Sequence, residues 1–174
     1  KQNIRYVEKF LQLGHNILCF SIDEANYICY TNKAREKRCA MNIQGFQKMT
    51  LLDFPGKVAC TVFTGGCNMR CPFCHNAGLV LSPTEYGNML DEVLEFLPKR
   101  VGLLDGVCIT GGEPLLQPDI VDFVKKIKEM GYLVKLDTNG CFPEKLKELV
   151  GNGLVDYVAM DIKNSPARYP ETVG

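Results

Sequence analysis

The sequence lacks an excess of charge of either sign, because its 20 lysines and arginines are balanced by 20 aspartates and glutamates. Zero net charge argues against nucleic-acid binding through bulk electrostatic attraction. Long uncharged runs are also missing: the longest has 14 residues, from Cys71 to Thr84, so we expect no membrane-spanning helix. The basic N-terminus is not followed by an apolar core and a small-residue cleavage site, so we expect no signal peptide.

What the sequence holds in quantity is hydrophobic residues and cysteine. Its 174 residues are 46% hydrophobic and 23% charged, which is the composition of a globular domain. A chain of this length buries roughly two-thirds of its surface on folding, so it needs no cross-links to hold a core. Because no secretory leader is expected, the nine cysteines favour metal binding or catalysis over disulfides.

The first forty residues differ in charge from the rest of the sequence. Residues 1–40 contain seven basic and four acidic residues, a net charge of +3, whereas residues 41–174 contain 13 and 16, a net charge of −3. The basic run at 33–38 is typical of a solvated surface. We therefore expect an N-terminal extension of unknown role at 1–40 and a functional domain at 41–174.

From residue 57 onward, signals for strands and helices alternate. Short β-rich runs predict four strands, at 57–64, 106–110, 132–138 and 154–162. Three helices are predicted between them, one from the capping box at 82–85 to Leu97, one at 118–131 and one at 143–150. This alternation implies right-handed crossovers and a parallel sheet, hence an α/β fold. Four β units are too few for a closed eight-stranded barrel, so we expect an open or partial barrel.

The strongest chemical signal is a C-x3-C-x2-C motif on the loop after the first predicted strand, formed by Cys67, Cys71 and Cys74. Thiolates are soft ligands that suit zinc or an iron–sulfur cluster. Both kinds of centre normally take four protein ligands, and three thiolates on a four-iron cluster leave one iron open. An open position is typical of a reactive site. The alternative is a zinc knuckle completed by Cys108 or Cys141.

Unusual polar and glycine residues follow the other three predicted strands, at 110–114, 137–140 and 161–163. Parallel α/β sheets build their active sites at the carboxyl ends of the strands. Strand alternation also places Lys135 and Asp137 on one face, away from the apolar face. Charges on that face need an ion pair or a ligand. Each motif taken alone also fits a plain turn, such as the one expected at 139–140.

Taken together, these motifs resemble those of the radical S-adenosylmethionine (radical SAM) enzymes. The resemblance rests on the cysteine motif, with Phe73 before its last cysteine, and on the Gly-Gly-Glu sequence at 111–113. Further segments resemble the branch of glycyl radical enzyme activases, namely 53–56, 63–67, 74–76, 137–140 and 161–163. Residues 41–74 are most similar to anaerobic ribonucleoside-triphosphate reductase activating proteins.

The resemblance implies a 4Fe–4S cluster on Cys67, Cys71 and Cys74, which are then both the metal ligands and the catalytic residues. The amino and carboxylate groups of S-adenosylmethionine take the open iron. The remaining candidates bind that cofactor. Gly111, Gly112 and Glu113 hold its methionine part; Phe73, His75 and Asn76 lie along its adenosine part; Asp137, Asp161, Ile162 and Lys163 contact its carboxylate and ribose. A monovalent cation between Asp137 and Asp161 is a further candidate.

The implied reaction is reductive cleavage of S-adenosylmethionine to methionine and a 5′-deoxyadenosyl radical, which takes a hydrogen from a glycine of a partner. The implied partners are a glycyl radical enzyme, first of all anaerobic ribonucleotide reductase, and a reduced flavodoxin- or ferredoxin-type electron donor. Oxygen-labile chemistry points to the cytoplasm. The alternatives are a radical SAM enzyme with a small-molecule substrate, and a non-catalytic zinc or electron-transfer module.

The family fold is a partial (β/α)6 barrel, of which this sequence supplies four β units. A further cofactor-binding histidine, expected late in the chain, has no counterpart, since the only histidines are His15 and His75. We therefore expect an incomplete barrel, shortened at its C-terminal end.

Overall fold

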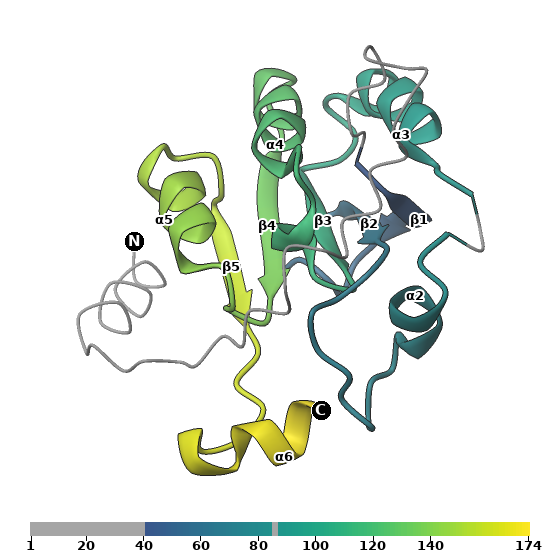
Figure 1. Ribbon diagram of the computed structural model, residues 1–174. Helices are drawn as coiled ribbons and strands as arrows, with labels where there is room; N and C mark the ends of the chain where they lie inside the picture. Colours follow the sequence, from purple (N-terminus) through teal and green to yellow (C-terminus); the bar gives the residue numbers. More distant parts are fainter. Residues whose placement is uncertain (1–40, 85–86) are drawn as a thin grey trace, which may run out of the picture.

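The computed structural model describes residues 41–84 and 87–174 of the chain (Figure 1). The N-terminal extension expected at 1–40, with its basic run and His15, lies outside these residues. Within the described part, the longest helices remain too short and too polar to cross a bilayer. One five-stranded sheet, in the order β1-β2-β3-β4-β5, organises the fold.

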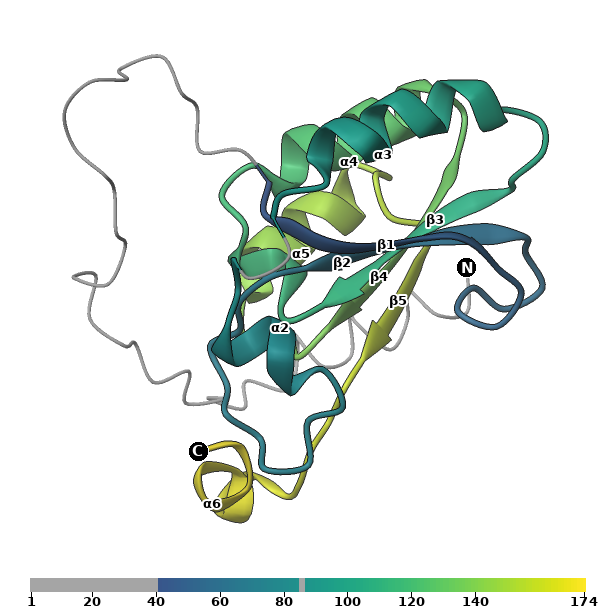
Figure 2. The same ribbon diagram turned by 90° about the vertical axis from the view of Figure 1, so that its right-hand side faces the viewer.

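Four of the strands are parallel and confirm the four predicted β units. They are β2 (Ala59–Thr64), β3 (Gly106–Gly111), β4 (Leu133–Thr138) and β5 (Tyr157–Met160). Each pairs with the next one along the chain, and helices α3, α4 and α5 all cover one face of the sheet (Figure 2). Sequential order with helices on one face is the winding of a barrel, whereas a doubly wound sheet carries helices on both faces. The α/β class and the open, partial barrel are therefore confirmed.

The strand β1 (Ile43–Thr50) is absent from the sequence prediction. It pairs antiparallel with β2, from Ile43 opposite Thr64 to Thr50 opposite Ala59, and its register shifts twice along the way. A hairpin turn joins the two strands, closed by Lys57 N–H donating to the Phe54 carbonyl at 3.0 Å, with Gly56 at a φ of 69°. The segment 53–56, one of those that carry the family resemblance, therefore lies at the tip of this hairpin.

The core lies between the sheet and three helices. These are α3 (Leu90–Phe96), continued by a 3-10 helix (Leu97–Arg100), α4 (Ile120–Glu129) and α5 (Pro143–Gly151). Apolar side chains of the central strands, such as Val62, Ile109 and Leu136, are fully buried against them. The second and third predicted helices are confirmed by α4 and α5. Short elements lie at the carboxyl edge of the sheet: α2 (Ala77–Leu81), 3-10 helices at Pro114–Leu116 and Pro166–Arg168, and α6 (Tyr169–Val173).

The predicted start of the first helix, at the capping box 82–85, is wrong. Ser82 instead ends α2, donating its N–H to the carbonyl of Gly78, and α3 begins at Leu90. Gly87 intervenes with a φ of 72°, which a continuous helix does not allow. The Asn88 side chain then accepts hydrogen bonds from the N–H groups of Leu90 and Ile43, both at 3.1 Å. These two bonds tie the start of α3 to the start of β1, a contact between segments far apart in sequence that the local capping pattern does not show.

Candidate active site

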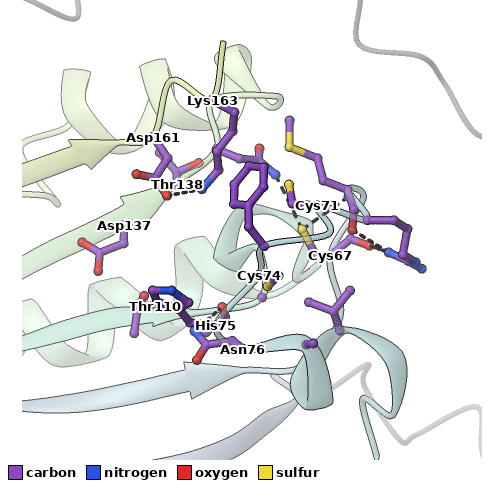
Figure 3. A pocket seen from close by; sticks show the side chains of 18 of the residues that line it. Cys67, Cys71, Cys74, His75, Asn76, Thr110, Asp137, Thr138, Asp161 and Lys163 are labelled. Carbon is purple, nitrogen blue, oxygen red and sulfur yellow. Dashed lines mark hydrogen bonds and ion pairs between the residues drawn. The ribbon is translucent and has the colours of Figure 1, made fainter. Parts of the chain in front are cut away.

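A cavity of about 690 Å³ opens at the carboxyl edge of the parallel strands, where the sequence motifs converge (Figure 3). Most of the predicted site residues line it: Cys67, Cys71, Phe73, Cys74, His75, Asn76, Gly111, Gly112, Asp137, Asp161 and Lys163. Figure 3 shows the three cysteines on one loop, with Asp137 and Asp161 at neighbouring strand ends. Two predicted residues, Glu113 and Ile162, are not part of the lining.

The cysteine loop follows β2 and is held by hydrogen bonds to main-chain carbonyls. Gly66, at a φ of 85°, donates its N–H to the carbonyl of Leu79 in α2 at 2.8 Å. The Arg70 guanidinium bonds back to the carbonyls of Cys67 and Met69, at 2.6 and 2.9 Å. Asn76 donates from Nδ2 to the carbonyl of Gly111 at 3.1 Å, which fixes the end of the loop to β3. The loop is thus tied to α2 at its start and to β3 at its end.

The donor set of this loop fits an iron–sulfur cluster by its chemistry. Three soft sulfur donors stand within eight residues on one wall of the cavity. Burial raises the pKa of the Cys67 and Cys71 thiols; the charge of Cys71 adds to the rise at Cys67, and the charge of Cys74 adds to the rise at Cys71. The three sulfurs share this wall but do not lie close enough together to bind one metal ion. Within residues 41–84 and 87–174, no three side chains of His, Cys, Asp or Glu are arranged as a metal site.

The geometry does not favour a zinc knuckle, because neither proposed fourth ligand lines the cavity. Cys108 is buried on β3, where its sulfur lies 3.7 Å from both the Asp137 carboxylate and the Lys135 ammonium. Burial, and after it the charge of Asp137, raises the pKa of Cys108 to about 12.

The Gly111–Gly112 turn packs directly on the cysteine loop. Gly112 donates its N–H to the Thr64 carbonyl and Glu113 donates its N–H to the Gly66 carbonyl, both at 2.8 Å. A Cβ added to Gly112 would lie 1.9 Å from the Gly66 oxygen, so no larger residue fits. Gly111, at a φ of 114°, is equally constrained. The two glycines are therefore required by contact between backbones.

The Glu113 side chain does not line the cavity and is completely buried. Its carboxylate accepts hydrogen bonds from Leu115 N–H (2.9 Å), Thr138 Oγ1 (2.8 Å) and Asn139 N–H (2.7 Å). Burial raises the pKa of Glu113, against the lowering effect of these three bonds. Glu113 thus joins the end of β3 to the end of β4. Ile162, the other residue outside the lining, is 62% exposed.

The charges predicted on the open face of the sheet occur as ion pairs. Lys135, only 7% exposed, pairs with Asp137. Burial works to lower the pKa of Lys135, but the hydrogen bond and charge of Asp137 outweigh it, and the pKa is raised. The second pair joins Lys163 Nζ to Asp161 Oδ2 at 2.6 Å, and Lys163 also lies 5.9 Å from the centre of the Phe73 ring. Asp137, Asp161 and Lys163 therefore present charge to the cavity.

Several lining residues were missed by sequence reasoning. Thr110, Thr138 and Asn139 belong to segments that were singled out, but only as turns or strand ends. Met69, Arg70, Val80 and Leu81 close the wall around the cysteine loop and α2. The five-residue helix α2 is too short to show a helical period, so no signal in the sequence could have located it.

A comparison with protein families decides the assignment, since the profile of the radical SAM superfamily matches residues 61–173. The chain belongs to this superfamily. The resemblance inferred from the motifs is confirmed, and with it the expectation of a 4Fe–4S cluster and S-adenosylmethionine as the family's cofactors.

Individual relatives of this radical SAM chain include proteins of the activase branch. A Methanocaldococcus jannaschii protein named as a glycyl-radical enzyme activating enzyme is 38% identical over 135 residues, which cover 75% of this chain and 54% of that protein. The pyruvate formate-lyase-activating enzyme of Clostridium pasteurianum is 35% identical over 130 residues, 70% of this chain and 52% of that enzyme. The chain thus spans about half the length of these relatives.

A third relative has a different printed activity. The GTP 3′,8-cyclase of Limosilactobacillus fermentum is 41% identical over 96 residues, which cover 52% of this chain and 29% of the cyclase. The shared part is shorter than for the two activating enzymes.

We predict that Gly112→Ala destabilises the protein and displaces the cysteine loop. The new Cβ meets backbone rather than a movable side chain, and overpacking of this kind costs about 1–3 kcal/mol. Urea denaturation of the metal-free chain measures the free energy of unfolding. The control is Gly151→Ala at the end of α5, where the Cβ meets open space and stability should be unchanged or higher by up to about 1 kcal/mol. Equal stability of the wild type and Gly112→Ala would contradict the packing described.

Proposed function

We propose that this radical SAM chain cleaves S-adenosylmethionine reductively and so generates a glycyl radical on a partner enzyme. The observation that carries the proposal is one cavity lined together by three thiols, the Gly111–Gly112 turn and the charged ends of β4 and β5. The cluster, when bound, supplies the electron that breaks the carbon–sulfur bond of the sulfonium. Residues of this chain would hold the cluster, bind S-adenosylmethionine and limit water around the reacting carbon.

Cys67, Cys71 and Cys74 would hold the cluster and, as three ligands for four irons, leave one iron for the amino and carboxylate groups of the cofactor. The methionine part would lie against the Gly111–Gly112 turn where it lines the cavity. Glu113, placed in contact with the cofactor by the sequence resemblance, is better suited to position β3 against β4, because its carboxylate is buried and fully bonded.

The polar side chains suit the rest of the cofactor. Lys163 offers a positive charge to its carboxylate, and Asp137 accepts from a ribose hydroxyl or shares a monovalent cation with Asp161. Phe73, His75 and Asn76 line the cavity beside the cysteines and would flank the adenosine. Ile162, which the resemblance also assigns to the cofactor, stands between the lining residues Asp161 and Lys163 in the sequence. Apolar side chains of Met69, Val80 and Leu81 limit water around the reacting carbon, which protects a radical from quenching.

The partner we propose is anaerobic ribonucleoside-triphosphate reductase, on the resemblance carried by residues 41–74. Pyruvate formate-lyase is the second candidate, favoured by the 35% identity to an enzyme that activates it. In either case a reduced flavodoxin- or ferredoxin-type protein would donate the electron, and the reaction would take place in an anaerobic cytoplasm. Residues 41–174 would form the radical SAM domain.

The first test is cofactor cleavage. We expect the chain, reconstituted with iron and sulfide without oxygen, then reduced and given S-adenosylmethionine, to release methionine and 5′-deoxyadenosine in equal amounts. Mass spectrometry measures both products. Absence of 5′-deoxyadenosine from a fully loaded, reduced chain would contradict the proposal.

The same sample then tests the partner, by electron paramagnetic resonance after each reductase or lyase is added. A glycyl radical signal identifies the partner. Cleavage that yields no such signal with either enzyme favours the small-molecule alternative, which the identity to a GTP 3′,8-cyclase supports.

We predict that Cys71→Ala abolishes cluster binding, because two thiolates cannot hold the centre. The iron bound per chain should fall by more than about tenfold. Removing a residue that only hydrogen-bonds to a metal ligand already lowers metal affinity by about tenfold or more, and Cys71 is a ligand itself. Iron analysis and the visible absorbance of the cluster measure this. Cys60→Ala is the control: Cys60 is buried in the helix-facing core of β2, so this variant should keep its cluster. Equal iron in both variants would contradict the assigned ligands.

Asp161→Ala should retain the cluster but weaken binding of S-adenosylmethionine. We expect roughly a tenfold loss of affinity, which equals about 1.4 kcal/mol. This value lies at the lower end of the range for hydrogen bonds to charged groups, because the Asp161 carboxylate is 74% exposed. Anaerobic equilibrium dialysis with the cluster-loaded chain measures the affinity. Glu171→Ala serves as the control, since this exposed carboxylate on α6 does not line the cavity. Unchanged affinity of Asp161→Ala would show that the end of β5 does not contact the cofactor.

A further inference from the structure

The Asn139 side chain connects the end of β4 to the cysteine loop. Its Nδ2 lies 2.8 Å from Asn68 Oδ1 and 3.7 Å from the sulfur of Cys67, residues about seventy positions earlier in the sequence. The same sulfur also accepts the N–H of Met69 at 3.4 Å. In the part of the chain that the structure describes, no side-chain N–H is recorded on the sulfur of Cys71 or Cys74. Cys67 is therefore distinguished from the other two thiols.

The orientation of this amide is fixed by its surroundings. Asn139 Oδ1 accepts the N–H of Cys141 at 3.0 Å, so its Nδ2 group must face the cysteine loop. Its main-chain N–H donates to Glu113 at 2.7 Å, and Gly140, at a φ of 79°, allows the turn that follows. Asn139 is thus held by contacts on both sides, and its donors cannot rotate away from the Cys67 sulfur.

We infer that Asn139 is a positioning residue that sets the reduction potential of the cluster through Cys67, an inference that rests on the proposed function. Hydrogen bonds to a cluster sulfur withdraw electron density from it and stabilise the reduced, more negative state. The Asn139 amide therefore raises the reduction potential and eases electron entry from the donor. Asn139 does this without contacting the reacting atoms, and its connection to Glu113 couples the end of β3 to the cluster.

The test separates this role from that of an ordinary turn residue. In Asn139→Ser, the hydroxyl can still accept the N–H of Cys141 and keep the turn, but it is too short to reach Cys67. We expect this variant to retain its iron and to show a lower midpoint potential, measured by an anaerobic redox titration followed by electron paramagnetic resonance without S-adenosylmethionine. Asn139→Gln, which keeps an N–H donor, should lie closer to the wild type.

The matched control is Asn164→Ser, the same substitution in an amide that donates to Thr172 Oγ1 at 2.8 Å and does not line the cavity. Its potential should equal that of the wild type. Equal potentials for Asn139→Ser and the wild type, or an equal shift in Asn164→Ser, would overturn the inference.

If Asn139→Ser does not load iron, Asn139→Asp replaces it. This variant matches asparagine in size and keeps the acceptor for Cys141, but it has no N–H donor. Its charge and its lost donors both lower the potential, so an unchanged value again overturns the inference. A wild-type chain that binds no cluster at all would contradict the proposed function itself, and the two failures are therefore distinguishable.

Discussion

The contact between the backbones of Gly112 and Gly66 is the constraint on which the site depends. The two N–H groups at 112 and 113 bond to the carbonyls of Thr64 and Gly66, both at 2.8 Å, and bring the end of β3 against the start of the cysteine loop. No side chain fits between them. Because the loop leaves β2 at this point, the position of Cys67 is set by the sheet, and a ligand need not order it. Such preorganisation lowers the cost of binding.

Glu113 fixes the end of β4 to the end of β3 through the hydrogen bonds of its carboxylate. A fully buried carboxylate is costly unless its oxygens are bonded, and each unsatisfied buried group costs about 1–3 kcal/mol. Its three donors come from both strand ends, so neither end can move without leaving the carboxylate unsatisfied. The Gly-Gly-Glu sequence thus has two structural roles. The glycines allow the end of β3 to contact the backbone of the cysteine loop, and the glutamate holds the end of β4 in place by hydrogen bonds.

The sequence alone predicted the four parallel strands, α4, α5 and the convergence of the motifs, because alternation, caps and strand ends are local signals. It missed β1 because this strand does not alternate between apolar and polar residues. Its apolar residues Ile43, Phe46 and Met49 recur at every third position, and the strand register shifts twice along the same stretch. The predicted start of α3 was wrong because the helix begins where Asn88 bonds to both Leu90 and Ile43 of β1, a contact that is not local in sequence. The burial of Glu113 and the bond from Asn139 to Cys67 join residues far apart in sequence, so no local pattern could indicate them.

The site therefore combines a rigid half with an open one. On the side of β2, β3 and β4, Glu113 is buried and the half-buried Asn76 and Asn139 are bonded to backbone, so these side chains hold the cysteine loop in place. On the side of β5, Asp161 and Ile162 are exposed, and Lys163 is held mainly by its neighbour Asp161. A metal centre needs fixed ligands, whereas a cofactor must enter and its products must leave. This division follows from where each strand lies, since β4 is flanked on both sides and β5 is an edge of the described sheet.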